Sequence, residues 1–281
     1  MTSLPVPQVK LNDGRSIPQL GFGVFKVAPA ETAAAVGEAL AVGYRHVDTA
    51  EMYGNERGVG EAIRAAELER DEVFVTSKLD NGLHRFDDVR PALERSLSEL
   101  GMEQLDLFLI HWPLPSRYGG DFVSTWKAMI EVCREGLTRS IGVSNFEVAH
   151  LERLARDTDV TPAVNQIELH PHLLNGEVSG WCEAHGIAIE AWAPIARAAV
   201  LAEPVIVSIA ERLERTPAQV VLRWHIQRGR IVFPKSVTPA RIAENFRLFD
   251  FELGDADMAA IDGLDRGEAG RTGPHPDRFP G

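Results

Sequence analysis

Four side chains that can hold or move a proton stand at or just beyond the ends of separate apolar segments: Asp48, Tyr53, Lys78 and His111. A free phenol, with a pKa of about 10, is a weak acid at neutral pH. A lysine ammonium at about 4 Å favours the phenolate by about 4 kcal/mol when the effective dielectric constant is about 20. Lys78 beside Tyr53 therefore predicts a phenol of lowered pKa that can protonate a substrate oxygen.

The other two residues fit the same chemistry. The carboxylate of Asp48 would keep Lys78 charged and oriented, and His111 would hydrogen-bond a substrate carbonyl. Tyr53 would then protonate the carbonyl oxygen as a hydride reaches the carbon. Taken alone, each residue is most often a helix cap, a solvated or packed side chain, or a structural histidine. Their positions on successive segment ends make the catalytic interpretation the stronger one.

The segments that must bring these residues together follow a regular order. Short apolar runs alternate with amphipathic helical stretches, a pattern typical of βα units with a parallel sheet. The eight apolar runs cover residues 19–25, 46–49, 73–78, 105–111, 138–144, 163–168, 187–192 and 231–235. The helical stretches cover residues 30–42, 56–66, 87–100, 122–134, 148–156, 177–185, 204–214 and 217–228.

Eight such alternations predict a (β/α)8 TIM barrel with extra helices, and the pattern alone leaves a doubly wound open sheet as the alternative. In such a barrel the active site lies at the C-terminal ends of the strands. An Asp13-Gly14 turn between short apolar stretches predicts an N-terminal β-hairpin, and residues 270–281 are expected to form a loop. We expect a single domain over residues 1–281, because this barrel commonly fills about 250 residues.

Longer motifs then reveal a family resemblance. Residues 43–56 (GYRHVDTAEMYGNE) closely resemble the signature of the aldo-keto reductases. The likeness runs from about Leu11 to the tail and is nearest to the bacterial branch that contains 2,5-diketo-D-gluconic acid reductases. Further matching motifs are 77–79 (SKL), 106–113 (DLFLIHWP), 139–146 (RSIGVSNF), 164–171 (VNQIELHP) and 233–236 (FPKS). The resemblance implies the same barrel and a catalytic tetrad of Asp48, Tyr53, Lys78 and His111.

The resemblance also implies NADPH as cofactor, with NADH as a weaker alternative. Hydrogen bonds to the nicotinamide carboxamide would come from Ser144, Asn145 and Gln166, and Trp192 would stack on the ring. A phosphate favours charge-assisted donors and a helix N-terminus, and Thr238-Pro239 has the form of a helix start. The residues implied for the adenosine end are Lys235, Ser236, Val237 and Arg241 around the 2′-phosphate, with Glu244 and Asn245 at the adenine.

For the substrate, the resemblance implies a cleft walled by Phe25 and Trp112, with Ala50 leaving space beside Tyr53 and His111. The loop 113–121 and the tail would complete it. Many relatives carry tryptophan two residues after the catalytic lysine, where this chain has Asp80. That anion predicts a preference for neutral dicarbonyls over negatively charged sugar acids.

Composition narrows the possible partners to small molecules. The formal net charge of −12, from 41 acidic and 29 basic residues, disfavours binding to nucleic acid or an anionic membrane. Two cysteines and the isolated histidines of 170–172 predict neither disulfide nor metal. Glu168 and Glu190 are expected to satisfy buried donors at the barrel end. The opening residues lack a leader pattern, so we expect a cytoplasmic protein. No exposed apolar helix is left over for a subunit contact, so we expect a monomer.

Two other functions stay open from the residues alone. One is a non-catalytic NADPH-binding protein on the same barrel, which the intact tetrad disfavours. The other is a barrel lyase or isomerase that uses Lys78 to form a Schiff base and needs no cofactor.

Overall fold

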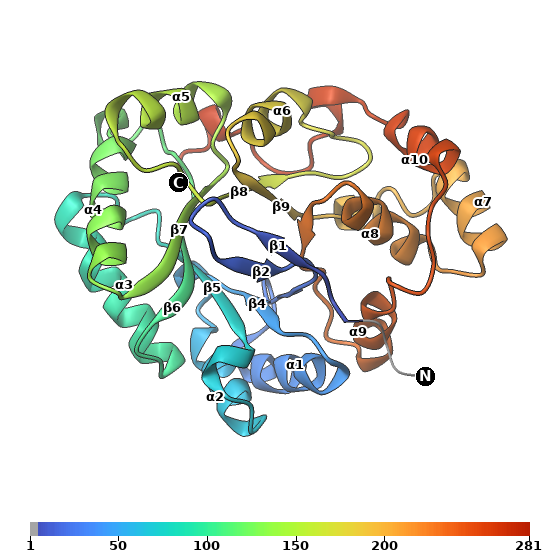
Figure 1. The fold of residues 1–281 in the computed structure, drawn as a ribbon, viewed down its shortest axis with the longest axis horizontal. Helices are drawn as coiled ribbons and strands as arrows, with labels where there is room; N and C mark the ends of the chain where they lie inside the picture. Colours follow the sequence, from blue (N-terminus) through green and yellow to red (C-terminus); the bar gives the residue numbers. More distant parts are fainter. Residues whose placement is uncertain (1–4) are drawn as a thin grey trace.

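The computed structural model describes residues 5–281, and the first four residues of the opening segment lie outside the described range. Its centre is a parallel sheet of eight strands in consecutive order, with helices outside it (Figure 1). The strands are β3 (Phe22–Gly23), β4 (His46–Asp48), β5 (Phe74–Leu79), β6 (Leu105–Ile110), β7 (Thr138–Ser144), β8 (Val164–Glu168), β9 (Ala188–Trp192) and β10 (Ile231–Val232).

Backbone hydrogen bonds join the first and last strands and close the sheet into a barrel. The Gly21 amide donates to the Val232 carbonyl at 2.8 Å, and the Val232 amide donates to the Gln19 carbonyl at 3.0 Å. A Cβ on Gly21 would lie 2.5 Å from Nδ1 of His46, so the seam needs glycine there. The predicted (β/α)8 barrel is confirmed, and the open doubly wound sheet is excluded by this closure.

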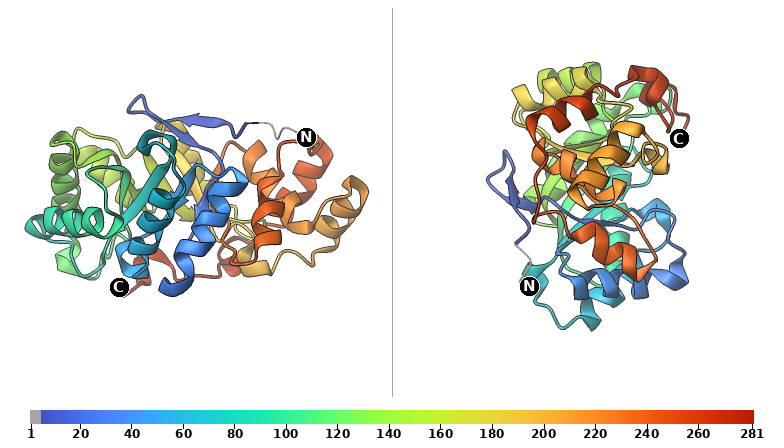
Figure 2. Two further views of the ribbon diagram at one scale, coloured as in Figure 1. Left: turned by 90° about the horizontal axis from the view of Figure 1, so that it is seen from below. Right: turned by 90° about the vertical axis from the view of Figure 1, so that its right-hand side faces the viewer.

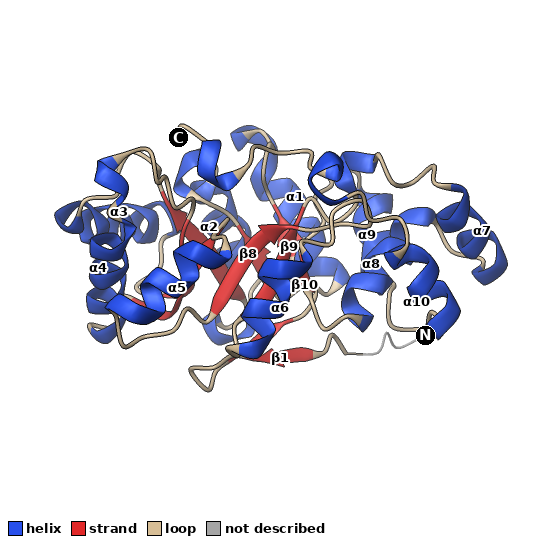
Figure 3. Ribbon diagram, turned by 90° about the horizontal axis from the view of Figure 1, so that it is seen from above, coloured by secondary structure: helices blue, strands red, loops and turns tan. Residues whose placement is uncertain are grey.

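Helices flank the strands of the barrel in the view of Figure 3, and β1 lies below them at one edge. Helix α8 begins with a capping box, because the Thr216 amide donates to Gln219 Oε1 at 3.1 Å and the Gln219 amide donates to Thr216 Oγ1. Helix α10 was not predicted from the sequence. The helices are α1 (Pro29–Val42), α2 (Glu56–Ala65), α3 (Phe86–Leu100), α4 (Phe122–Arg134), α5 (Val148–Asp157), α6 (Gly176–Ala184), α7 (Pro204–Leu213), α8 (Pro217–Gln227), α9 (Pro239–Phe246) and α10 (Asp255–Asp262).

The predicted N-terminal hairpin is confirmed and covers one end of the barrel. Strands β1 (Gln8–Lys10) and β2 (Ser16–Pro18) pair antiparallel, and Gly14 turns the chain with a φ of 87°. Leu11 and Ile17 pack in one apolar cluster with the barrel residues Leu107, Leu109 and Ile231. The hairpin and the C-terminal segment lie on opposite faces of the ring (Figure 2). One end of the barrel is thus sealed by packing, and the other is left for polar residues.

Between residues 5 and 281, the structure contains no helix with the length and hydropathy that a membrane span requires.

Candidate active site

The centre of the site is a buried ion pair at the C-terminal end of the barrel. Lys78 on β5 is fully buried and Asp48 on β4 is 2% exposed. The Lys78 ammonium donates to both Asp48 carboxylate oxygens at 2.8 and 2.9 Å and to the Thr49 carbonyl at 2.8 Å. Its remaining contact is the Tyr53 hydroxyl at 3.3 Å. The structure therefore brings together three of the residues that the sequence singled out from separate segments.

The ammonium of Lys78 is held in its charged form. Burial opposes that charge, but the Asp48 carboxylate and the Tyr53 phenol outweigh it and raise the pKa of Lys78 above its ordinary value. Two charges taken from water are stable only when each is well partnered. The bidentate contact with Asp48 and the carbonyl of Thr49 provide that partnership, so Lys78 is a fixed cation.

Tyr53 differs from the sequence-based expectation in its acidity. It ends a short 3₁₀ helix, η1 (Glu51–Tyr53), after which Gly54 turns with a φ of 65°. Burial raises the pKa of Tyr53, while the Lys78 ammonium lowers it by a smaller amount and Asp48 raises it further. The predicted net lowering is wrong, because the analysis of the sequence could not include the cost of burying a phenolate. The phenol stays protonated, and Lys78 is placed to stabilise the phenolate that forms when the proton leaves.

His111 follows β6 and lies beside Tyr53, with the two ring centroids 5.8 Å apart in an edge-on arrangement. Burial, with smaller effects of Lys78 and His84, holds the pKa of His111 well below its usual range. Its imidazole is therefore neutral at physiological pH and has one N–H group to donate. A neutral donor next to a phenol suits the recognition of a carbonyl oxygen.

One residue expected at the cofactor is bonded directly to the tetrad. The side-chain amide nitrogen of Gln166, on β8, donates to Asp48 Oδ2 at 2.8 Å and to Glu190 Oε2 at 2.7 Å. These two bonds fix the orientation of the amide. Its carbonyl oxygen, at the other end of the amide group, is left to accept a hydrogen bond from a ligand. Glu190 is fully buried and satisfies a buried donor, as expected, and that donor is the Gln166 amide.

The other residues expected at the nicotinamide form a connected set around His111. The Trp192 indole donates to Asn145 Oδ1 at 2.8 Å, and the Asn145 amide nitrogen donates to the His111 carbonyl at 2.9 Å. The Ser144 hydroxyl donates to the Gln166 carbonyl at 2.8 Å. Asn145 has a φ of 63°, a conformation that asparagine tolerates better than most residues. The ends of β7, β8 and β9 thereby present amide and hydroxyl groups in one place.

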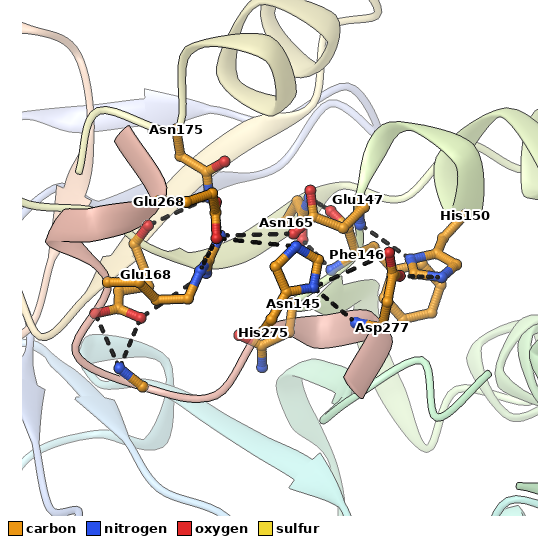
Figure 4. A network of polar contacts seen from close by, with 12 residues as sticks. Asn145, Phe146, Glu147, His150, Asn165, Glu168, Asn175, Glu268, His275 and Asp277 are labelled. Atoms are coloured by element: carbon orange, nitrogen blue, oxygen red, sulfur yellow. Dashed lines mark hydrogen bonds and ion pairs between the residues drawn. The ribbon is translucent and has the colours of Figure 1, made fainter. Parts of the chain in front are cut away.

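The tail is anchored to the barrel rim by a carboxylate. Glu168 accepts hydrogen bonds from the backbone amides of Thr272 and Gly273 and from the side chain of His170. A Cβ on Gly273 would lie 2.5 Å from the Trp192 ring, so the tail packs against that indole. Figure 4 shows tail side chains among those of the rim. Glu168 does satisfy buried donors, as expected. The expected loop 270–281 contains the turn η6 (Pro276–Arg278), and the turn η5 (Gly267–Gly270) ends at its first residue.

The residues expected at the 2′-phosphate lie where β10 leads into α9. Ser236 is buried and its hydroxyl oxygen accepts from the Thr238 amide at 3.1 Å. Lys235 and Arg241 are exposed on either side of the start of α9, and Val237 is 46% exposed.

At the adenine end, Asn245 is half-buried. Its neighbour Glu244 accepts from the Thr216 hydroxyl at 2.9 Å, so part of its side chain is used to hold α9 against α8.

The side chains expected at the substrate are exposed to solvent to different extents. Phe25 is 50% exposed, with its ring centroid 5.0 Å from that of Tyr53. Trp112 is 8% exposed and packs on Phe279 of the tail at 4.2 Å. Ala50 is fully buried and presents no surface to the cleft.

A contact that was not expected from the sequence lies in the segment that follows Asp80. Tyr118, from the loop 113–121, stacks on His84 with ring centroids 5.4 Å apart and donates to the Asn81 carbonyl at 3.0 Å. Asp80 Oδ1 accepts from the Gly82 amide.

Comparison with known proteins identifies the family of the chain. The model of the Aldo/keto reductase family matches residues 19–266. Methylglyoxal reductase DkgA of Yersinia pestis is 48% identical over 97% of each chain, and that of Escherichia coli (strain K12) is 46% identical over 97% of this chain and 98% of the other. The crystal structure of Gox0644 in its apo form matches with a TM-score of 0.94 and 46% identity, over 98% of this chain and 99% of the other.

A Gox0644 variant solved in complex with NADPH also has a TM-score of 0.94, at 45% identity and the same coverage. The fold is a (β/α)8 barrel that brings Lys78, Asp48 and Tyr53 together near the ends of its strands, with the ring of His111 beside Tyr53. The chain belongs to the aldo-keto reductase family, a class of oxidoreductases that act on carbonyl compounds.

The buried ion pair predicts a strong coupling between its two members. Asp48→Asn and Lys78→Met each leave one uncompensated buried charge, so each is expected to lower the free energy of unfolding by about 3–5 kcal/mol. The double variant carries no net charge there and is expected to lose much less than the sum of the two. Urea unfolding of all four proteins measures this. Additive losses would show that the two charges do not depend on each other.

Proposed function

We propose that this protein reduces a small aldehyde, ketone or dicarbonyl to the alcohol with NADPH, with Tyr53 as the general acid. The observation that carries the proposal is the 3.3 Å contact between the phenol of Tyr53 and a fully buried, ion-paired ammonium, next to a neutral imidazole. Family membership and the relatives named methylglyoxal reductase support carbonyl reduction.

The residues present fit NADPH at both ends of the cofactor. Ser144, Asn145 and the oriented amide of Gln166 would hold the carboxamide, and Trp192 would stack on the nicotinamide. Lys235, Ser236, Arg241 and the free amides of the α9 N-terminus would hold the 2′-phosphate, because a phosphate favours charge-assisted donors. Bound in this way, the reduced nicotinamide supplies the hydride.

The chain itself supplies the proton and the orientation. The N–H of His111 donates to the carbonyl oxygen and directs it toward the Tyr53 hydroxyl. Tyr53 gives its proton to that oxygen as the carbon gains the hydride, so the product is a neutral alcohol. The resulting phenolate lies beside the fixed cation of Lys78, which stabilises charge that exists only late in the reaction.

Neutral dicarbonyls such as methylglyoxal are the substrates we propose. Phe25 and Trp112 offer apolar and aromatic surface, which suits a small uncharged ligand. Asp80 stands in the segment that follows Lys78, and its carboxylate would repel an anionic sugar acid there.

The geometry disfavours a Schiff-base enzyme. Lys78 attacks a carbonyl only as a free amine, yet its pKa is raised and its nitrogen is engaged by Asp48, Thr49 and Tyr53. Family membership and the relatives named methylglyoxal reductase likewise disfavour a non-catalytic NADPH-binding protein, and a measurement of turnover tests this.

Tyr53→Phe tests the proposed acid. The change removes one hydroxyl, so kcat for methylglyoxal reduction is expected to fall at least about 100-fold, because a general acid contributes about 10²–10⁴-fold. NADPH affinity, measured by fluorescence titration, is expected to stay within about twofold. Binding of NADPH without turnover in the unmodified protein would favour the non-catalytic alternative, and an unchanged kcat in the variant would exclude Tyr53 as the acid.

Arg241→Ala tests the proposed 2′-phosphate site. Loss of a charge-assisted hydrogen bond of about 1.5 kcal/mol is expected to raise KM for NADPH about tenfold and to leave KM for NADH unchanged. Arg247→Ala is the matched control, since Arg247 is exposed at the opposite end of α9. Equal effects on NADPH and NADH, or equal effects of the two variants, would contradict this assignment.

A further inference from the structure

Glu190 is a carboxyl group inside the barrel that the proposed reaction does not use. It lies on β9, opposite Gln166 of β8 and Ile231 of β10 in the sheet register, and it is fully buried. Its Oε2 atom accepts from the Gln166 amide nitrogen at 2.7 Å. Within residues 5–281 its Oε1 atom is buried without a hydrogen-bond partner.

The charges around Glu190 balance only while it is protonated. The nearest ions are Asp48 and Lys78, which neutralise each other. His46, on the same strand as Asp48, is neutral because burial lowers its pKa to about 3, and His111 is neutral as well. The facing residue of β10, Ile231, is apolar.

Farther out at the rim, Glu168 of β8 lies 3.9 Å from the Arg271 guanidinium and bonds tail amides. An ionised Glu190 therefore adds an unpaired negative charge to the barrel interior. Burial, with the charge of Asp48 added, raises the pKa of Glu190 to about 8.

A single amide separates this carboxyl from the proposed nicotinamide site. The Gln166 nitrogen donates to Glu190 and to Asp48 at once, which turns the amide oxygen away from both and toward the cofactor. The positive charge of an oxidised nicotinamide would consequently lie close to Glu190 in a poorly solvated interior, where charges interact more strongly than in water.

We propose that Glu190 is a positioning residue whose proton is linked to the oxidation state of the cofactor. It orients the Gln166 amide, stays neutral beside the uncharged dihydronicotinamide, and loses its proton to solvent when the cationic nicotinamide of NADP⁺ binds. The proposal rests on NADPH binding at the site described above. Linkage is reciprocal, so NADP⁺ affinity increases as the pH rises through the titration of Glu190.

Calorimetry of cofactor binding tests this linkage. NADP⁺ and NADPH carry the same 2′-phosphate, so its titration affects the Kd of both in the same way. The difference between the pH dependences of the two Kd values therefore reports the charge of the nicotinamide alone. Between pH 6 and pH 9.5, the Kd for NADP⁺ is expected to fall about tenfold relative to the Kd for NADPH. Titrations near pH 8 in two buffers of different ionisation enthalpy are expected to detect proton release with NADP⁺ only.

Variants assign the effect to this carboxyl. Glu190→Gln keeps an acceptor for Gln166 and removes the titration, so both signals are expected to vanish, while Glu190→Asp is expected to restore part of them. Glu56→Gln is the matched control, because Glu56 is also buried but bonds Ser77 on the outer side of β5, and it is expected to behave as the unmodified protein. The same pH dependence in Glu190→Gln as in the unmodified protein would overturn the proposal.

If the Glu190 variants do not fold, the linkage can still be tested on the unmodified protein. Infrared difference spectra with ¹³C-labelled glutamate at pH 8 are expected to show a protonated carboxyl band in the NADPH complex that weakens in the NADP⁺ complex. An unchanged band would overturn the linkage. Failure of the unmodified protein to bind either cofactor would instead overturn the proposed function.

Discussion

The contact between Lys78 and Asp48 is the interaction on which the site depends. An ammonium with no exposed surface is stable only because a carboxylate from the neighbouring strand and the Thr49 carbonyl surround it. The same carboxylate accepts from Gln166, and the same ammonium contacts Tyr53. The proposed proton donor and the proposed cofactor site are thus positioned by one ion pair, which the pairing of β4 with β5 brings together.

The rest of the barrel keeps this pair buried. The hairpin seals one end with an apolar cluster that includes Leu11 and Ile17. At the other end, the tail is held by Glu168 and lies against Trp192. A site enclosed in this way strengthens the electrostatic effects within it, which is why the proton of one further carboxyl, Glu190, can matter to the bound cofactor.

Much of the fold could be predicted from the sequence, because eight apolar runs that alternate with helices are compatible with few arrangements of strands in a sheet. The tetrad followed from asking which polar residues end each run, and the contacts of Lys78 with Asp48 and Tyr53 are as expected. The acidity of Tyr53 was predicted in the wrong direction, since it depends on burial that a sequence does not display. Glu190 satisfies a buried donor, as expected, but the identity of that donor, Gln166, could not be predicted because it depends on the pairing of neighbouring strands. The docking of Tyr118 on His84 is likewise a matter of loop conformation.

The central claim is that Lys78 promotes reduction through the phenol of Tyr53 and not through another group. The most direct measurement is kcat for carbonyl reduction in Lys78→Met, Tyr53→Phe and the double variant. Groups that act as one unit have losses that do not multiply, so adding Lys78→Met to Tyr53→Phe is expected to change kcat by less than about threefold. A double variant whose loss equals the product of the two single losses would contradict the account.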